Sequence, residues 1–432
     1  MEKKGEKIKE FFKKHYENNI FSSDEKMNRT EMFFKSDIST KDEAIVNSKI
    51  LNKTSTCFTK KKNKNNYKGQ YLNKLKHGKG ILYYDDNTIE YEGDFINDIL
   101  QGNGKYFYEN GEYYVGQFFN GGKHGKGTIY YKDGKIKYEG EFFNDKMQGN
   151  GKYIYENGEY YIGKWCNNQK HGKGIIYDKD GNIHYEGEFL NDVYHGKGKL
   201  INEEGSYYIG QFFNGYMHGK GIIYDKDGTI EYDGEYFKNY FHGKGKYIYE
   251  DGSYYIGERL YDKKNGKGIL YSKNGSIQYE GDFANGVPHG NGKFIYEDGE
   301  YYIGEWFDGN MDGKGKIFYK NGNIKYDGDF HNGNYHGEGK YIDENGACYI
   351  GHWVDDLKNG SGTLYYPDNK IKYKGEFING SFHGNGTFFF ENGDYYIGQW
   401  YNDLKHGKGI IYSKDGKVKC EGIFIEDKYI KK

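Results

Sequence analysis

The chain has 432 residues, with 62 Lys and Arg against 64 Asp and Glu, so its net charge is −2. Aromatic residues make up 19% of the sequence and glycines number 67, but the hydrophobic fraction is only 35%. Because an ordinary globular domain is roughly 45 to 50% apolar and disordered chains are poor in aromatics, the composition argues against both a large aliphatic core and disorder. We expect a thin, repetitive, aromatic core.

Targeting signals and paired cysteines are missing from the sequence. No apolar run approaches the roughly 18 residues of a membrane span, and no signal-peptide pattern follows Met1. We therefore expect a cytoplasmic protein that is neither secreted nor membrane-spanning. Cys57, Cys166, Cys348 and Cys420 lie far apart, which predicts free thiols instead of a disulfide framework or a zinc site.

Residues 1–66 form a basic, polar segment with 16 Lys and Arg against 10 Asp and Glu, a net of +6 that leaves −8 for the rest. Apolar spacing predicts a short amphipathic helix over residues 6–18, and residues 22–64 have a disordered composition. The helix is either a basic anchor for a membrane or a partner, or part of a solvated tail that caps the array. We favour the tail, because the apolar face has only four residues.

From residue 67 onward a Tyr-x-Gly motif recurs in steps that alternate between 24 and 23 residues, which gives a full period of 47. Such an unbroken register is typical of units that pack only on their neighbours. Cys420 replaces the tyrosine of a sixteenth copy. The anchor tyrosines are Tyr67, Tyr91, Tyr114, Tyr138, Tyr161, Tyr185, Tyr208, Tyr232, Tyr255, Tyr279, Tyr302, Tyr326, Tyr349, Tyr373 and Tyr396.

Each copy has the features of a β-hairpin. Asn-Gly and Asp-Gly dipeptides, which favour two-residue turns, follow the short apolar runs. A second motif, His-Gly-x-Gly with Gln, Asn or Asp in some copies, lies between anchors, and we expect the chain to reverse there with the His or Gln bonded to backbone. The predicted two-residue turns are Asn110-Gly111, Asp133-Gly134, Asn157-Gly158, Asp227-Gly228, Asp251-Gly252, Asn321-Gly322 and Asn392-Gly393.

Strand alternation places Tyr185, Gly187 and Phe189 on one face and Glu186 and Glu188 on the other. The fold prediction is all-β: an elongated, single-layer antiparallel β-hairpin solenoid, preceded by a mostly disordered or short-helical segment. The predicted domains are residues 1–66, an array over 67–425, and a C-terminal tail over 426–432. The tail either caps the last strand or pairs with a second molecule.

The pattern resembles the MORN (membrane occupation and recognition nexus) repeat family through Tyr161-Ile162-Gly163-Lys164-Trp165 followed by His171-Gly172-Lys173-Gly174. The resemblance covers residues 67 to about 425. It implies a non-enzymatic scaffold at a cytoskeletal, ciliary or cortical membrane site. Arg259 departs from the pattern because an aromatic residue is expected there, which predicts a bend or a weaker joint.

Two sets of residues are candidates for contact with partners. In alternate hairpins an apolar pair replaces charge on the face opposite the packed rings, which predicts a protein-docking or self-association strip. Lysines near the Gly-x-Gly motifs predict a basic edge for anionic lipid, but we slightly favour a solvated edge that discourages edge-to-edge aggregation. The strip residues are Tyr113, Val115, Tyr160, Ile162, Tyr207, Ile209, Tyr254, Ile256, Tyr301, Ile303, Tyr395 and Ile397, and the edge residues are Lys74, Lys76, Lys79, Lys123, Lys126, Lys170, Lys173, Lys405 and Lys408.

No catalytic, cofactor or metal site is predicted. The same polar groups recur in every unit, whereas catalysis needs dissimilar groups that converge. The loop histidines of neighbouring hairpins are expected roughly 10 Å apart, too far to share a metal. The acidic array argues against nucleic acid as a partner. We expect a scaffold for protein partners, with a phosphoinositide-binding module or a regulatory subunit of an enzyme on another chain as alternatives.

Overall fold

A computed structural model describes residues 66–430 as two compact units, 66–229 and 230–430. The predicted N-terminal helix and Cys57 lie outside the described residues. Within residues 66–430 every regular element is a β-strand, which confirms the all-β prediction. No helix in this part of the chain is long and apolar enough to cross a membrane.

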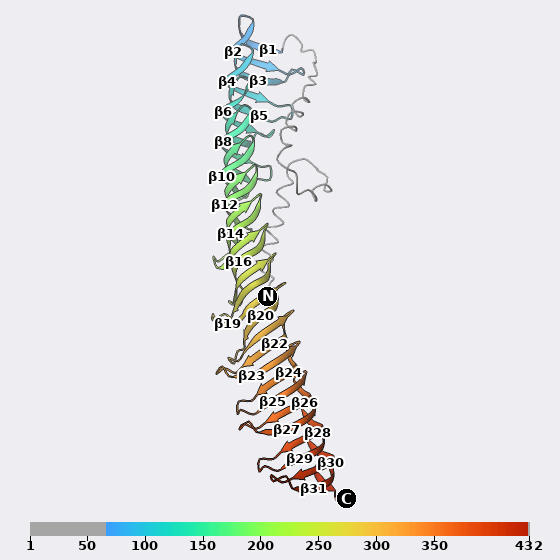
Figure 1. Ribbon diagram of the computed structural model, residues 1–432. Helices are drawn as coiled ribbons and strands as arrows, with labels where there is room; N and C mark the ends of the chain where they lie inside the picture. The colour runs from blue at the N-terminus through green and yellow to red at the C-terminus, as the bar shows by residue number, and fades with distance from the viewer. Residues whose placement is uncertain (1–65, 431–432) are drawn as a thin grey trace, which may run out of the picture. The chain divides into compact units, whose positions relative to one another are not determined.

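The first unit holds fourteen strands that follow each other in chain order (Figure 1). They are β1 (Tyr67–Leu72), β2 (Leu75–Tyr83), β3 (Ile89–Ile96), β4 (Ile99–Phe107), β5 (Tyr113–Phe119), β6 (Gly122–Tyr130), β7 (Ile136–Phe143), β8 (Lys146–Ile154), β9 (Tyr160–Cys166), β10 (Gln169–Tyr177), β11 (Ile183–Leu190), β12 (Val193–Ile201), β13 (Tyr207–Phe213) and β14 (Tyr216–Tyr224).

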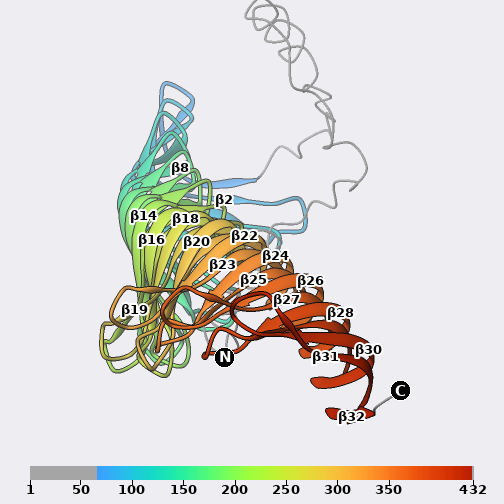
Figure 2. The ribbon, with the colours of Figure 1, turned by 60° about the horizontal axis from the view of Figure 1, so that its bottom comes forward.

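The second unit continues the same alternation of strands, and Figure 2 shows β22 to β28 stacked one behind another. Its strands are β15 (Ile230–Phe237), β16 (Tyr240–Ile248), β17 (Tyr254–Leu260), β18 (Lys263–Tyr271), β19 (Ile277–Ala284), β20 (Val287–Ile295), β21 (Tyr301–Phe307), β22 (Asn310–Phe318), β23 (Ile324–His331), β24 (Asn334–Ile342), β25 (Cys348–Val354), β26 (Leu357–Tyr365), β27 (Ile371–Ile378), β28 (Ser381–Phe389), β29 (Tyr395–Tyr401), β30 (Leu404–Tyr412), β31 (Val418–Ile425) and β32 (Lys428–Ile430).

Within each unit a row of glycines fixes the register of the antiparallel sheet. On β9, Gly163 pairs with Gly174 of β10, which pairs in turn with Gly187 of β11. A Cβ at Gly163 would collide with the Tyr161 hydroxyl and would lie 2.6 Å from the Cα of Gly174. Only glycine therefore leaves room for a tyrosine ring to lie against the sheet.

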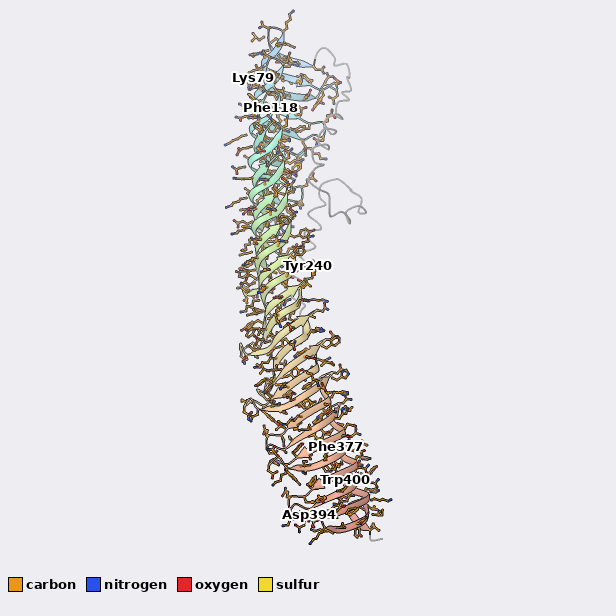
Figure 3. All side chains as sticks on the ribbon, in the orientation of Figure 1. Lys79, Phe118, Tyr240, Phe377, Asp394 and Trp400 are labelled. Atoms are coloured by element: carbon orange, nitrogen blue, oxygen red, sulfur yellow. The ribbon has the colours of Figure 1, made fainter. Side chains whose placement is uncertain are left out.

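The anchor tyrosines form the core on what we call the tyrosine face. Tyr161 is fully buried, its hydroxyl donates to the Lys164 carbonyl at 2.9 Å, and its ring meets Trp165 and Phe189 edge to face. This arrangement satisfies the polar end of each ring and favours T-shaped contacts. Equivalent rings, Phe118 in one unit and Phe377 and Trp400 in the other, are labelled in Figure 3.

The turns differ from those predicted, although the hairpins themselves are confirmed. Asn110-Gly111 and the six similar dipeptides lie in five-residue connections in which only the glycine has a positive φ, 86° at Gly111. The two-residue turns lie at the opposite edge, where Asn97 (φ 50°) and Asp98 (φ 69°) are one example. Asp98 also accepts from the Lys76 N–H at 2.8 Å, which ties the turn to the preceding hairpin.

The prediction that the chain reverses at Gly-x-Gly is wrong. His171-Gly172-Lys173-Gly174 lies inside β10, and the pairing with β9 jumps from Lys170 opposite Trp165 to Gly174 opposite Gly163. Two extra residues therefore bulge from β10, with Gly172 at φ 59°. A bulge re-aims neighbouring side chains without ending the strand.

The C-terminal tail caps the last hairpin within the chain. β32 pairs antiparallel with β31, so Phe424 lies opposite Tyr429. A Cβ at Gly422 would lie 2.7 Å from the Tyr429 ring, and the Tyr429 hydroxyl donates to the Glu421 carbonyl at 3.0 Å. Tyr429 thus covers the glycine that Cys420 leaves uncovered, and the structure shows the first of the two predicted roles.

Arg259 occupies an aromatic position without a change of register, because Gly257 still pairs with Gly268. The side chain is 7% exposed and its guanidinium lies 4.8 Å from the Tyr247 ring centroid. Its Nη1 donates to the Asp262 carbonyl at 2.6 Å, whereas its buried Nε has no hydrogen-bond partner. The register shows no bend, and a weaker joint here stays a prediction.

Candidate interaction surface

The face opposite the tyrosines carries aliphatic side chains that the sheet leaves in solvent. Seven of them, one in each alternate hairpin, are 40 to 45% exposed. We call them the aliphatic strip: Val115, Ile162, Ile209, Ile256, Ile303, Ile350 and Ile397. Their exposure fits the predicted docking strip, because solvent-facing apolar side chains in a regular row tend to mark interfaces.

The strip tyrosines are less available than the aliphatic residues. Tyr207 is half-buried and stacks on Tyr224 with ring centroids 4.7 Å apart, and the Lys199 Nζ lies 4.2 Å from the Tyr207 centroid. The stack and the cation–π contact hold these rings in place. The same arrangement of lysine, tyrosine and second ring recurs at Tyr113, Tyr160, Tyr254 and Tyr301. Tyr395 stacks on Tyr412.

Across the strands, each strip residue belongs to a line of paired side chains, which we call the central row. Ile162 pairs with Ile175, Ile175 with Glu186, and Glu186 with Lys199. Lys199 pairs with Ile209, where the order starts again. The central row therefore repeats two apolar residues, an acid and a base every four strands.

A shallow groove follows the central row at the first hairpins. Its volume is about 840 Å³, and its floor is the glycine row from Gly69 to Gly116. Ile81, Glu92, Lys105 and Val115 line one side. The groove mixes apolar, acidic and basic walls, so it suits a polypeptide better than a ligand of one charge.

The nine lysines of the predicted lipid edge do not lie on one edge. Lys170 pairs with Trp165 on the tyrosine face, whereas Lys173 pairs with Glu188 on the opposite face. The intervening bulge separates them. Lys76, Lys123 and Lys405 correspond to Lys170, Lys79, Lys126 and Lys408 correspond to Lys173, and Lys74 lies in a two-residue turn.

The lysines on the tyrosine face lie among aromatic rings. Lys123 Nζ is 2.9 Å from the Tyr108 hydroxyl and lies within 6 Å of the Tyr108, Tyr114 and Phe142 centroids. At the equivalent Lys358, burial lowers the pKa of the ammonium below its usual value. These lysines are part of the packing and are poorly placed to meet a membrane.

The loop histidines pack between rings at the two-residue-turn edge of the opposite face. The His124 ring lies 5.4 Å from Phe119 and 5.1 Å from Phe143. Gln101, at the equivalent position, accepts from the Asn120 N–H at 3.1 Å, which confirms the predicted bond to backbone for that residue. The His124 Nδ1 is buried without a hydrogen-bond partner. Residues 66–430 contain no cluster of three His, Cys, Asp or Glu side chains placed to hold a metal.

The sequence analysis did not predict the exposed aromatic rings that lie beside these histidines. They stand five residues after an anchor, directly before the two-residue turn, and are 49 to 63% exposed. The signal was a recurrent apolar residue at that offset, which strand alternation places on the opposite face. They are Phe119, Phe143, Phe213, Phe307 and Tyr401.

The comparisons with known proteins agree with this repeat geometry. The profile described as MORN repeat matches fifteen consecutive segments, each of which starts at an anchor tyrosine. The chain belongs to the MORN repeat family. The matched segments are 67–89, 91–113, 114–136, 138–160, 161–183, 185–207, 208–230, 232–254, 255–277, 279–301, 302–324, 326–348, 349–371, 373–395 and 396–418.

Other comparisons add little to the MORN assignment. No curated protein matches the chain. A protein of unknown function from Bacteroides caccae is 15% identical, with a TM-score of 0.13 over 59% of this chain and 90% of that one. The computationally designed Ika8 protein is 12% identical, with a TM-score of 0.14 over 74% of this chain and 95% of that one. Neither superposition is close enough to support an argument.

Proposed function

We propose that this MORN repeat protein is a non-enzymatic scaffold that holds protein partners against the face opposite the tyrosines. Its setting would be a cytoskeletal, ciliary or cortical membrane-associated assembly. The observation that carries the proposal is the aliphatic strip, whose seven residues remain 40 to 45% exposed. A sheet that needed only to fold could place Thr or Lys there, as β26 and β22 do with Thr363 and Lys316.

A pair of charge variants in the same strands tests this proposal. Val115→Asp with Ile209→Asp places charge on the strip, whereas Gln117→Asp with Gln211→Asp adds the same charge two residues away on the same face. The control positions tolerate aspartate, because Asp94 naturally fills the equivalent place and accepts from the Asn103 N–H at 3.1 Å.

The measurement is quantitative affinity capture with the full chain. We expect a set of proteins to be retained by the wild type and the control but lost with the strip variant. Equal retention by all three chains would contradict docking through the strip. A single exposed apolar contact is worth about 1 to 3 kcal/mol, so a loss of at least about tenfold is expected.

Anionic lipid is a second candidate, favoured by lysines beside the central row in the first unit. Lys126, Lys164, Lys173, Lys197 and Lys220 are exposed on the opposite face. Acidic partners dilute this charge, as in the 2.7 Å pair of Lys79 and Asp94. Flotation with anionic vesicles at increasing salt tests lipid binding. Salt-sensitive flotation that Lys164→Glu with Lys197→Glu removes would support binding through these lysines. Flotation by wild type and variant alike would contradict a role for the lysines, and absence of flotation by the wild type would contradict lipid binding.

A further inference from the structure

The central row of residues 66–229 has a direction that the sheet itself does not require. Fourteen strands contribute one residue each, and the order apolar, apolar, acid, base repeats with two exceptions, Lys68 and Thr128, each of which stands in an apolar place. The row is Lys68, Ile81, Glu92, Lys105, Val115, Thr128, Glu139, Lys152, Ile162, Ile175, Glu186, Lys199, Ile209 and Ile222.

This order is complementary to itself when one copy runs antiparallel to the other. Reversal turns apolar, apolar, acid, base into base, acid, apolar, apolar. Aligned on the apolar couples, the reversed copy places every acid over a base and every base over an acid. The parallel alignment of apolar couples instead places acid on acid and base on base. Like charges in contact are strongly disfavoured, so the order selects one orientation.

We propose that two copies of this chain pair antiparallel, central row to central row, through residues 66–229. The inference deepens the proposed scaffold function by naming one partner as a second copy of the chain. A two-fold axis across the row gives an isologous interface. If residue i of one copy contacts residue j of the other, then residue j of the first copy also contacts residue i of the second.

The charged members of the central row are available for such a partner. Glu139 and Glu186 are exposed, and within the described residues neither carboxylate forms an ion pair with its neighbour in the row. Lys152 and Lys199 instead hold their Nζ over Tyr160 and Tyr207 at 4.3 and 4.2 Å. A partner lysine would thus meet a carboxylate that has no competing ion pair inside the sheet.

The overlap is large enough for a specific dimer. An axis between Glu139 and Lys152 pairs all fourteen strands, and the two mismatches are then Lys68 over Ile222 and Thr128 over Ile162. Three periods of about 19 Å, over a strip about 14 Å wide, cover about 800 Å² on each copy. That area corresponds to a standard protein–protein interface.

The second unit lacks the same complementarity. Lys316 follows Ile303 where an apolar residue is needed, and Lys374 and Thr387 replace the acid and the base of another period. Antiparallel copies of that row would bring lysines over apolar residues. The self-pairing surface is therefore assigned to the first unit.

A charge exchange in the full chain tests the pairing. Variant A carries Glu139→Lys and Glu186→Lys, so lysines face lysines in the dimer. Variant B adds Glu92→Lys, Lys105→Glu, Lys152→Glu and Lys199→Glu to variant A, which keeps the net charge of the wild type and restores complementarity at every charged position between two B chains. Trp165 fluorescence and circular dichroism verify folding, and B retains an acid–base neighbour at each position within the sheet.

Sedimentation velocity measures each chain alone and mixtures with one chain labelled. We expect the wild type and B each to dimerise, A to dimerise at least about tenfold more weakly, and B to exclude the wild type. Because Lys152 and Lys199 also cover tyrosines, the self-association of B alone is measured as well as its association with the wild type. A monomeric wild type, or B that mixes freely with the wild type, would overturn the proposal.

Cysteine pairs report the orientation in a background without native cysteines. Ile81 and Ile209 face each other across the axis between Glu139 and Lys152, and lie roughly 53 Å apart along the ladder of one chain. We expect an interchain disulfide in Ile81→Cys with Ile209→Cys and none in either single variant. A disulfide in Ile209→Cys alone would show parallel copies and overturn the proposal.

The failure of self-pairing and the failure of the scaffold function are distinguishable. If the wild type is monomeric and its captured proteins are lost with Val115→Asp and Ile209→Asp, the aliphatic strip binds a different protein and not a second copy of the chain. Dimers that survive variant A while captured proteins are unaffected by the strip variant would contradict both inferences.

Discussion

Each anchor tyrosine works together with two glycines. The ring of Tyr373 lies against Gly375 and Gly386, and its hydroxyl donates to the Glu376 carbonyl at 3.0 Å. The ring is fully buried although the sheet has no second layer on that side. The stability of a hairpin therefore depends on space at a residue that carries no side chain.

Adding one methyl group at the glycine row is expected to destabilise the second unit. In Gly386→Ala the Cβ would collide with the Tyr373 ring, and overpacking of this kind costs about 1 to 3 kcal/mol. Urea unfolding followed by Trp400, whose Nε1 donates to the Gly386 carbonyl, measures the change. Gly416→Asn is the control, because no atom lies within 4 Å of a Cβ there and Asn tolerates a positive φ. An equal loss in both variants would contradict the steric argument.

Buried tyrosines make the fold sensitive to alkali. Burial raises the pKa of Tyr396 to about 12 and that of Tyr161 and Tyr302 further. A group whose folded pKa lies above its unfolded value of about 10 stabilises the fold below pH 10 and loses that contribution as pH rises toward the folded pKa. Burial lowers the pKa of Lys358, so the contribution of this lysine to stability rises with pH, but it is a single group.

Stability is therefore expected to fall steeply above pH 10, by about 1.4 kcal/mol per pH unit for each tyrosine that ionises on unfolding. Tyrosinate absorbance and circular dichroism should change together. Tyrosinate that appears gradually while the sheet remains intact would contradict the assignment of these rings to the core.

Arg259 is a residue that the fold tolerates at a cost. Its buried Nε lacks a partner, and Trp306, Trp353 and Trp400 occupy the equivalent position in later hairpins. Arg259→Trp should stabilise the unit by about 1 to 3 kcal/mol, because it removes a buried charge and restores an edge-to-face ring. Thermal unfolding measures the gain, and Arg259→Gln, which removes the charge but adds no ring, should give a smaller one. An equal gain in the glutamine variant would locate the effect in the charge alone.

At the scale of the hairpin, the two-residue turns do more than reverse the chain. The Phe382 N–H donates to Asp403 Oδ1 at 2.7 Å, and the Asp403 N–H donates to the Phe382 carbonyl at 3.1 Å. Each such turn thus bonds to the hairpin before it. Where glycine holds the second turn position only the backbone bond remains, as between the Gly380 N–H and the Lys358 carbonyl at 2.9 Å.

A side chain at Gly380 should restore the missing bond. Gly380→Asn places an amide oxygen near the Lys358 N–H, in the manner of Asn168, which accepts from the Met147 N–H at 2.7 Å. The residue has φ 89° with no atom within 4 Å of a Cβ. We expect about 0.5 to 1.5 kcal/mol of stabilisation, read from urea unfolding, and none from Gly380→Ala. Equal effects of the two substitutions would show that chain entropy, not the bond, is responsible.

At the scale of the whole molecule, the period that matters for interaction is 47 residues, twice that of the hairpin. The tyrosine and glycine rows repeat in every hairpin, whereas the aliphatic strip and the lysines among rings alternate. Folding therefore depends on the hairpin, and the surface presented to partners depends on the pair of hairpins.

Deletions of defined length separate these two periods. Deleting residues 138–184 removes one full period and should leave both folding and the order of the central row intact. Deleting residues 138–160 removes one hairpin and should fold as well, but Thr128 would then adjoin Ile162 and the alternation of charge would break. Circular dichroism reports folding and sedimentation reports self-association. Misfolding of the shorter deletion alone would show that the alternation also serves the fold.

The sequence by itself determined the hairpin, its register and the face on which the rings pack. Those features follow from strand alternation and from a spacing that never slips, so Tyr185, Gly187 and Phe189 were placed on the correct face. The tertiary structure decided where the chain turns and which lysines share a surface. A bulge of two residues within β10 separates Lys170 from Lys173, and no local signal distinguishes such a bulge from a turn, because glycine at a positive φ occurs in both, at Gly172 in the bulge and at Gly111 in a turn.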